Sequence, residues 1–203
     1  MVGTLLTVVV PTIPGRESVL SRCLWSIQTQ APGSVEVLVV PGSGQLGDKA
    51  TMAAHLAEGR HMVLVDDDDY LAADYMAHVL PALEGDPDFV GYRILQIVNG
   101  RYHGSATTRG DCSQFGRVDH GPTPKGATRA SIWRELGMKN HYTADRMWHD
   151  AATRLVRSSV FIDRNLYVYD HHERSSAFIG DGSPLEVGTW PYDPALVRWV
   201  PLG

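Results

Sequence analysis

Four consecutive carboxylates, Asp66 to Asp69, are the residues whose type and spacing most clearly indicate chemistry. They directly follow a short apolar run, residues 62–65, which is typical of a buried strand in a parallel sheet. Ligands in open α/β sheets bind beyond the carboxyl ends of the strands. Four adjacent acids raise one another's pKa values unless a cation lies among them. Both a metal–diphosphate site and a solvated acidic turn fit this stretch, and its position after a buried strand favours the first.

The composition is that of a folded domain. The chain has 203 residues, of which 43% are hydrophobic and 20% charged, enough for one domain with a substantial core. The formal net charge of −5 argues against an extended basic face for nucleic acid, although a nucleic-acid acceptor stays open. The two cysteines, Cys23 and Cys112, form no CxxC pair, so neither a disulfide framework nor a cysteine zinc site is predicted.

The first ten residues are apolar, but they lack a basic start and a small-residue cleavage site. They therefore predict a first strand and not a signal peptide. No apolar run is long enough to span a membrane. We expect a cytoplasmic protein.

The first third of the chain alternates apolar runs with segments of helical spacing. These patterns predict strands at 5–10, 35–40 and 62–65, and helices at 17–30 and 48–59. Asp48 is the expected N-cap of the second helix and Gly59 its C-cap. A strand–helix–strand–helix–strand order predicts a parallel sheet.

The remaining elements continue this pattern less regularly. We expect a helix at 73–84 that Pro81 kinks or ends, a strand at 89–97, a return strand at 101–103, helices at 127–136 and 144–156, and a strand at 160–169. The return follows Asn99-Gly100, a hairpin signal. Residues 105–123 are predicted as a long loop, and 175–203 carry no predicted element. The fold class is α/β: a mostly parallel central sheet flanked by helices, with a small antiparallel hairpin.

Four stretches, in this order, resemble glycosyltransferase family 2, which has the GT-A fold. They are Thr7-Val-Val-Val-Pro-Thr12 at the nucleotide-binding turn, residues 48–69 leading into the DxD motif, Ala144-Asp145-Arg146-Met147-Trp148 at the catalytic base, and Tyr169-Asp170-His171-His172-Glu173-Arg174-Ser175 near the metal site. The resemblance covers about residues 5–176.

The resemblance implies a metal-dependent glycosyltransferase. Such an enzyme moves a sugar from a UDP- or GDP-sugar to an acceptor hydroxyl on a glycan, a protein or another macromolecule, with Mn²⁺ or Mg²⁺ as cofactor. Its implied mechanism is inverting, although a retaining one stays open. Residues 1–176 would form the GT-A domain, and residues 177–203 a tail that packs on it or closes over it.

The resemblance also assigns roles at the acidic turn. Asp66 and Asp67 are expected at the nucleotide-sugar, Asp68 at the metal, and Asp69 as the alternate metal ligand if the register shifts by one residue. His172 is the better histidine ligand, with His171 second, because imidazole ligates Mn²⁺. Two ordinary surface histidines are the alternative.

Asp145 is the expected general base. A carboxylate near an apolar wall such as Trp148 has its pKa raised towards the working range. The alternative role for Asp145 is the N-cap of its own helix. Asp150 falls on a different helical face and is a weaker candidate.

Further candidates for binding residues lie where the first strand meets the first helix, in the second helix and after the long loop. Pro11, Thr12 and Arg16 follow the first strand, where backbone amides and an arginine suit a nucleotide. A surface residue in the first turn of the helix is the alternative role for Arg16. Lys49 either contacts a phosphate or is solvated. Lys125 and Arg129 follow the long loop and are weak candidates for contacts with the acceptor or the phosphates.

The sequence departs from the family in three places. Pro41-Gly42-Ser43-Gly44 replaces the usual Asp-Asp-Gly-Ser, so no carboxylate is available there to read the base. Ala50-Thr51 replaces an Arg-Asn pair, and Ala144 replaces the glutamate before the catalytic aspartate. Two alternative functions are a sugar-phosphate nucleotidylyltransferase, which usually has a glycine-rich basic loop for which Pro14-Gly15-Arg16 is too sparse, and a non-catalytic module that binds nucleotide-sugars.

Overall fold

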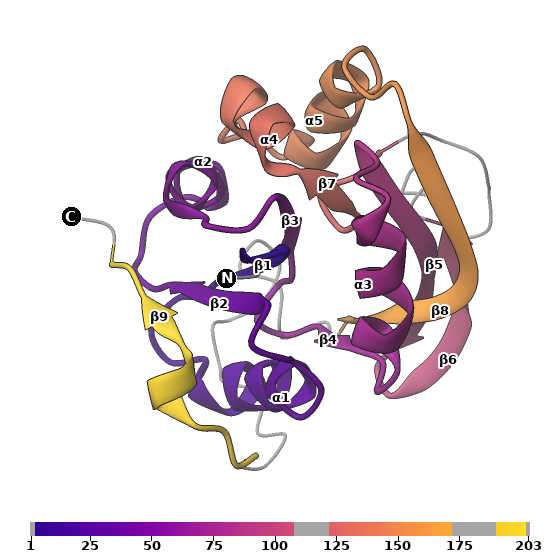
Figure 1. Ribbon diagram of the computed structural model, residues 1–203. Helices are drawn as coiled ribbons and strands as arrows, with labels where there is room; N and C mark the ends of the chain where they lie inside the picture. Colours follow the sequence, from indigo (N-terminus) through magenta and orange to yellow (C-terminus); the bar gives the residue numbers. More distant parts are fainter. Residues whose placement is uncertain (1–2, 108–121, 172–189, 202–203) are drawn as a thin grey trace.

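The computed structural model describes residues 3–107, 122–171 and 190–201 (Figure 1). Its strands are β1 Leu6–Pro11, β2 Val35–Val40, β3 His61–Leu64, β4 Tyr70–Leu71, β5 Phe89–Val98, β6 Arg101–Thr107, β7 Ala127–Arg129, β8 Ser159–His171 and β9 Arg198–Trp199. Its helices are α1 Glu17–Gln28, α2 Leu46–Leu56, α3 Tyr75–Glu84, α4 Ala130–Leu136, α5 Ala144–Ala152 and the 3₁₀ helix η1 Pro194–Leu196.

All described strands join one sheet in the order β4-β8-β5-β7-β3-β1-β2-β9, with β6 paired to β5. Pairing is parallel between β1 and β2, β1 and β3, β2 and β9, and β5 and β8. The antiparallel pairs are the β5–β6 hairpin and three short ladders that involve β4 or β7. This confirms the α/β class, the mostly parallel sheet and the small hairpin.

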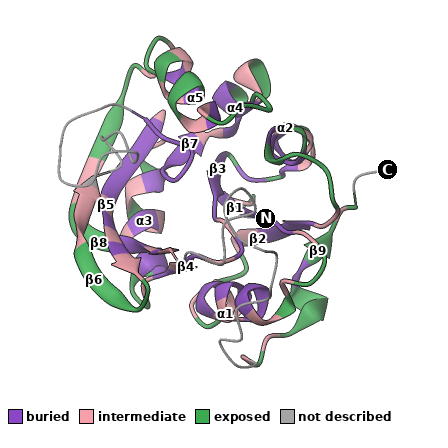
Figure 2. Ribbon diagram, turned by 180° about the vertical axis from the view of Figure 1, so that it is seen from behind, coloured by how far each residue is buried: buried purple, intermediate pink, exposed green. Residues whose placement is uncertain are grey.

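The strands are buried because helices cover both faces of the sheet (Figure 1). Side chains alternate along β1: Val8 and Val10 join the core under α1 and α3, and Val9 joins the core under α2, α4 and α5. Figure 2 shows β1 and β3 buried, whereas β6 and the first half of β8 are largely exposed. The central strands therefore form a rigid base for the residues at their carboxyl ends.

Several short elements differ from the predictions or were absent from them. The sequence predicts a helix over 127–136, but residues 127–129 form β7, and α4 starts at Ala130. β7 pairs with both β3 and β5, so tertiary pairing overrides the local helical pattern. β4 and β9 have two residues each, which is too short for any periodicity to show.

The ends of α2 also differ from the prediction. The helix begins at Leu46 after Gln45, and Asp48 lies inside its first turn, where it accepts a 2.8 Å hydrogen bond from Asn140. It ends at Leu56, so Gly59 is not its C-cap. A Cβ at Gly59 would lie 2.5 Å from the backbone nitrogen of Thr7. Glycine is required there because this segment packs directly against β1.

α3 continues past Pro81 to Glu84, so the proline does not end it.

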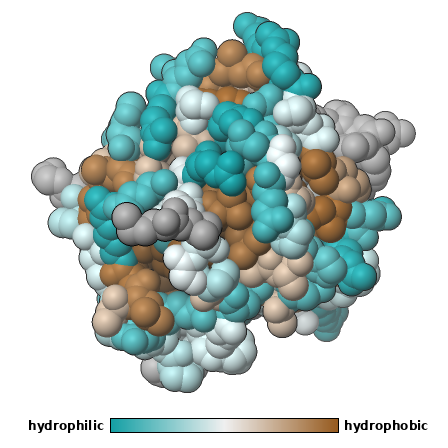
Figure 3. Space-filling view, in the orientation of Figure 1, coloured by the Kyte–Doolittle hydropathy of each residue, from teal (hydrophilic) through white to brown (hydrophobic). Residues whose placement is uncertain are grey.

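In the described part of the chain, no helix is both long and apolar enough to cross a membrane. The face in Figure 3 carries small hydrophobic patches separated by hydrophilic side chains.

Candidate active site

The acidic turn lies where β3 ends beside β1. The backbone N–H of Val65 still donates to Val9, at 2.9 Å, and the chain then turns, with the N–H of Asp69 donating to the carbonyl of Asp66 at 3.0 Å. β4 follows at once. The sequence prediction that a buried strand delivers these four acids is therefore confirmed.

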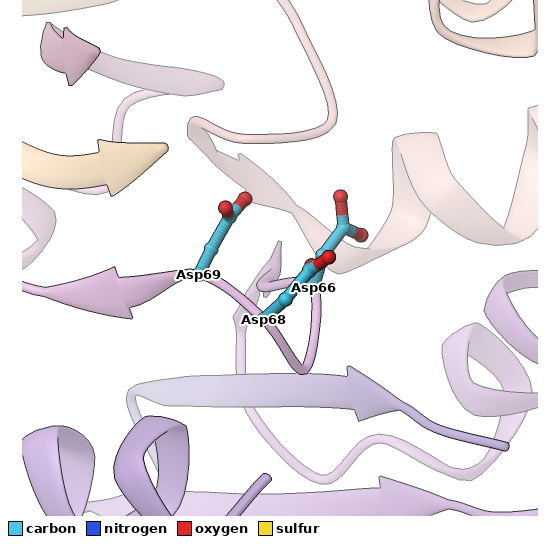
Figure 4. A group of neighbouring side chains, drawn as sticks. All are labelled: Asp66, Asp68 and Asp69. Carbon is cyan, nitrogen blue, oxygen red and sulfur yellow. The ribbon is translucent and has the colours of Figure 1, made fainter. Parts of the chain in front are cut away.

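Three of the four acids gather on this turn (Figure 4). One carboxylate oxygen from each of Asp66, Asp68 and Asp69 lies within 4.8 Å of the others. Asp69 is buried, whereas Asp66 and Asp68 are partly exposed, and the buried Oδ1 of Asp66 has no hydrogen-bond partner. Such a set of hard oxygen donors fits Mg²⁺ or Mn²⁺.

Asp67 contacts the turn between β1 and α1 instead. Its Oδ2 accepts a 2.6 Å hydrogen bond from the hydroxyl of Thr12, and its Oδ1 lies 3.3 Å from the guanidinium of Arg16. Burial raises the pKa of Asp67 to about 7, although Arg16 and Thr12 oppose that rise. Asp67 thus anchors the acidic turn to β1, and among the four acids it is the one outside the group of three.

Arg16 lies just before α1 and also pairs with Asp68, at 2.5 Å. Pro11 is the buried last residue of β1. Thr12, the next residue, holds Asp67 through its side chain, and its backbone N–H donates to the carbonyl of Val40 at 3.0 Å. Thr12 and Arg16 therefore contact the acidic turn, whereas Pro11 belongs to β1 and does not follow it.

Lys49 has neither of its two predicted roles, which were a phosphate contact and a solvated surface position. Its side chain is fully buried, and its ammonium donates to the carbonyls of Thr12 at 2.6 Å and of Gly42 at 2.5 Å. These carbonyls follow β1 and β2, so Lys49 ties together the ends of the two strands. In this conformation its ammonium is neither solvated nor free for a phosphate.

Lys125 is buried at the acidic turn and forms an ion pair with Asp66. Its ammonium also lies 4.0 Å from Asp69 Oδ2 and 5.6 Å from the ring centre of Tyr167. Burial lowers the pKa of Lys125, but the neighbouring acids, led by Asp66, raise it further, so the net shift is upward.

Asp69 is held entirely by the protein. It accepts hydrogen bonds from the Tyr167 hydroxyl and, at 3.0 Å, from the backbone N–H of Asp170. Burial raises the pKa of Asp69 well above its usual range, while Lys125 opposes the rise. Asp69 therefore couples the acidic turn to the end of β8.

Arg22 is a residue of this region that sequence reasoning missed. Its guanidinium donates to Asp170 Oδ2 and to the backbone carbonyl of Asp68, each at 2.6 Å, and lies 4.6 Å from the ring centre of Tyr70. The only signal in the sequence is an arginine next to the buried Cys23 on α1. That signal does not identify which part of the chain the arginine contacts.

Asp145 lies in the first turn of α5, after Thr143, so its alternative role as the N-cap is wrong. It is half-buried. Burial raises its pKa, Lys125 opposes the rise, and Asp66 adds to it. The electrostatic coupling to Lys125 and Asp66 associates Asp145 with the acidic turn, whereas Asp150 is exposed.

The predicted histidines and Arg129 lie elsewhere or outside the described chain. His171 ends β8 with its ring stacked on Tyr169, at 6.0 Å between ring centres, and is not part of the group of three carboxylates. His172 lies outside the described residues. Arg129 pairs with Asp86 at 2.8 Å and Asp88 at 2.9 Å.

The prediction for Arg129 is wrong because β7 runs antiparallel to β3. Arg129 is opposite His61, at the start of β3, whereas the acidic turn follows the end of that strand.

A surface hollow of about 560 Å³ lies between α1 and η1, lined by residues that include Trp25, Tyr192 and Leu196. None of the carboxylates of the candidate active site lines this hollow, so it is separate from the acidic turn.

No sequence model of a known protein family matches the chain, and no curated protein sequence matches it. Solved structures do match. The structure of residues 1–349 of Staphylococcus aureus TarS matches with a TM-score of 0.66 at 18% sequence identity. The match covers 82% of this chain and 60% of the TarS chain. The same TarS segment with UDP-GlcNAc gives 0.67 at 17% identity, covering 86% and 60%.

A further match is the mannosyltransferase PcManGT from Pyrobaculum calidifontis, whose structure contains GDP-Man and Mn²⁺. Its TM-score is 0.57 at 16% identity, with 85% of this chain and 58% of that chain covered. The chain thus spans about three fifths of the length of these structures. The likeness establishes a shared fold, and the GT-A fold implied by the sequence resemblance is confirmed.

Proposed function

We propose that this chain is a metal-dependent glycosyltransferase that moves a sugar from a nucleotide-diphosphate donor to an acceptor hydroxyl. The observation that carries the proposal is the group of three carboxylates, Asp66, Asp68 and Asp69, after the buried strand β3 of a GT-A fold. The solved neighbours with UDP-GlcNAc and with GDP-Man support a nucleotide-sugar as the donor.

Charge balance at the acidic turn supports a divalent ion. Among the described residues, only two cationic side chains, Arg16 and Lys125, pair with the four carboxylates of residues 66–69. These two cations do not compensate all four carboxylates once the turn is ionised, so a divalent ion such as Mg²⁺ or Mn²⁺ would stabilise the ionised turn. The unpartnered Oδ1 of Asp66 and the partly exposed Asp68 are the natural ligands. A bound ion would supply Lewis-acid stabilisation of the leaving diphosphate.

The remaining steps belong to the chain's own residues. Asp145 would accept the proton of the acceptor hydroxyl, because a half-buried carboxylate with a raised pKa is a better base than an exposed one. Thr12 and Arg16 would line the nucleotide side, where they already fix Asp67. Residues 1–176 would form the catalytic domain and 177–203 its tail. An inverting displacement is the simplest scheme with one such base.

A thermal-shift panel tests the proposal, with UDP-GlcNAc, UDP-glucose and GDP-mannose each measured with Mn²⁺ and with EDTA. At 100 times its dissociation constant, a donor stabilises the folded protein by about 2.7 kcal/mol, or roughly 5–10 °C for this chain length. We expect this shift for one nucleotide class with Mn²⁺ and its loss in Asp68→Asn. The exposed Asp150→Asn is the matched control. A shift that survives EDTA, or that Asp68→Asn retains, would contradict metal-dependent donor binding.

A further inference from the structure

Lys125 contacts two of the three carboxylates that could hold a metal ion at the acidic turn. Its ammonium pairs with Asp66 and lies 4.0 Å from Asp69, so its one positive charge is shared between two members of the group of three carboxylates. Its side chain is only 6% exposed, so water screens these pairs weakly. In this conformation the chain itself provides the positive charge.

The backbone of Lys125 is fixed by its neighbours. Its carbonyl accepts a hydrogen bond from Tyr92, whose hydroxyl in turn lies 3.1 Å from that of Tyr75. The preceding residue, Pro124, accepts a 3.1 Å hydrogen bond from the backbone N–H of Leu64 in β3. The turn carrying Lys125 is therefore attached to the sheet on two sides.

Gly126 fixes this turn on its other side. Its N–H donates to the carbonyl of Thr123 at 2.9 Å, and a Cβ at this position would lie 2.2 Å from the ring of Phe89. Because the main chain is held this closely, any change of partner by the Lys125 ammonium would require rotation of its own side chain. That side chain is long and flexible, as lysine side chains are.

Lys125 pairs with Oδ2 of Asp66, and a divalent ion at the unpartnered Oδ1 would lie on the same carboxylate, so the two cations would repel each other there. Asp66 is shared between the Lys125 ion pair and the group of three carboxylates. Resting on the proposed function, we infer that Lys125 is an exchangeable counter-ion: it holds Asp66 in the metal-free protein, is released when Asp66 binds the divalent ion, and then contacts the leaving diphosphate. Lys125 would thus be both a positioning residue for Asp66 before the metal binds and a cation for the anionic product.

The chain offers an internally controlled test, because it has only three lysines: Lys49, Lys125 and Lys139. Lys139 is exposed, and Lys49 is buried with its ammonium held by two backbone carbonyls. Acetylation of the wild-type protein, followed by peptide mass spectrometry, reports the reactivity of each amine in one sample. Lys139 serves as the fast reference and Lys49 as the slow one.

Without metal, we expect Lys125 to react as slowly as Lys49. Mn²⁺ alone should raise its rate towards that of Lys139, and Mn²⁺ with UDP or GDP should protect it again, with Lys49 and Lys139 unchanged. A second measurement uses electron paramagnetic resonance to determine the Mn²⁺ affinity of Lys125→Gln. This variant should bind Mn²⁺ about tenfold more tightly than the wild-type protein, because a buried cation next to Asp66 is gone.

The outcomes separate the inference from the proposed function. If Mn²⁺ binds and supports donor binding while Lys125 stays as slow as Lys49, the inference is wrong and the proposed glycosyl transfer stands. If Lys125→Gln binds Mn²⁺ no more tightly than the wild type, competition for Asp66 is contradicted. If the wild-type protein binds no Mn²⁺ at all, the inference and the metal dependence fail together.

Discussion

At the scale of single residues, the proposed transfer depends most directly on Asp145, whose pKa is raised by burial. Asp145→Asn removes the proton acceptor and keeps the shape of the side chain. We expect turnover to fall roughly 10²–10⁴-fold, the usual contribution of a positioned base. Donor binding in a Mn²⁺-dependent thermal shift should persist.

Asp150→Asn, on the exposed side of the same helix, should keep full turnover. Equal losses in the two variants would show that the effect comes from α5 as a whole and not from a base at Asp145.

The sequence identified the acidic turn and two of its cations, Arg16 and Lys125, but did not place Lys49 or Arg129 correctly. Four acids after an apolar run are visible in the sequence because position along the chain is enough to find them. The positions of Lys49 and Arg129 are set by partners far away in the sequence. Lys49 is buried and donates to two backbone carbonyls, and Arg129 lies at the start of β3, opposite the end that carries the acidic turn. Residue type and spacing carry no information about such partners, and the same holds for Arg22.

At the scale of elements, the contact between Gly59 and β1 explains a glycine that local patterns assign to a helix cap. A methyl group there would meet the backbone of β1, which cannot move aside as a side chain would. We expect Gly59→Ala to lower the free energy of unfolding by about 1–3 kcal/mol in urea denaturation, as for other overpacked sites.

Gly33→Ala is the matched control for Gly59→Ala. No atom lies within 4 Å of a Cβ at Gly33, and its φ is not in the left-handed region. It should be neutral or slightly stabilising, because alanine restricts the unfolded chain. If both variants are neutral, Gly59 does not pack against β1 as described.

His61, at the start of β3, makes the stability of the sheet depend on pH. Its ring is buried, with Nε2 donating to the carbonyl of Pro87 at 2.7 Å, and burial lowers its pKa. The folded protein therefore favours neutral His61, and the unfolded chain binds a proton first. Stability is full above the unfolded pKa of about 6.5 and is lost as the pH falls below it towards the lower folded pKa.

His61→Gln keeps a donor for Pro87 but cannot titrate, so it should flatten this part of the stability curve. Urea denaturation at a series of pH values between 7 and about 5 measures the effect, where the pH range follows the ordinary histidine pKa. An unchanged slope in His61→Gln would mean that other groups control stability in this range.

At the scale of the whole molecule, the sheet is completed by residues far apart in the sequence. β9 pairs with β2 in parallel, and Val197 just before it is buried in the core under α1 and α3. Neither feature was predictable, because a two-residue strand has no periodicity and its partner lies about 160 residues earlier. Only the complete fold shows that this part of the tail covers an edge of the sheet.

The junction between Val197 and the core provides a test of this arrangement. Val197→Asp removes a buried valine and introduces a charge into the core, so we expect a loss of about 2–4 kcal/mol in the free energy of unfolding. If β9 detaches as a result, the edge of β2 becomes available to another chain, and association should rise with protein concentration. Urea denaturation and analytical ultracentrifugation measure the two effects.

Leu196→Asp is the neighbouring control. Leu196 is 63% exposed, whereas Val197 is 7% exposed, so the same new charge at position 196 should change stability by no more than about 0.5 kcal/mol. A large loss in Val197→Asp alone would establish that β9 is held by the core and closes the sheet at β2. Equal effects in the two variants would mean that this part of the tail adds little to the folded state and that the edge of β2 does not need β9.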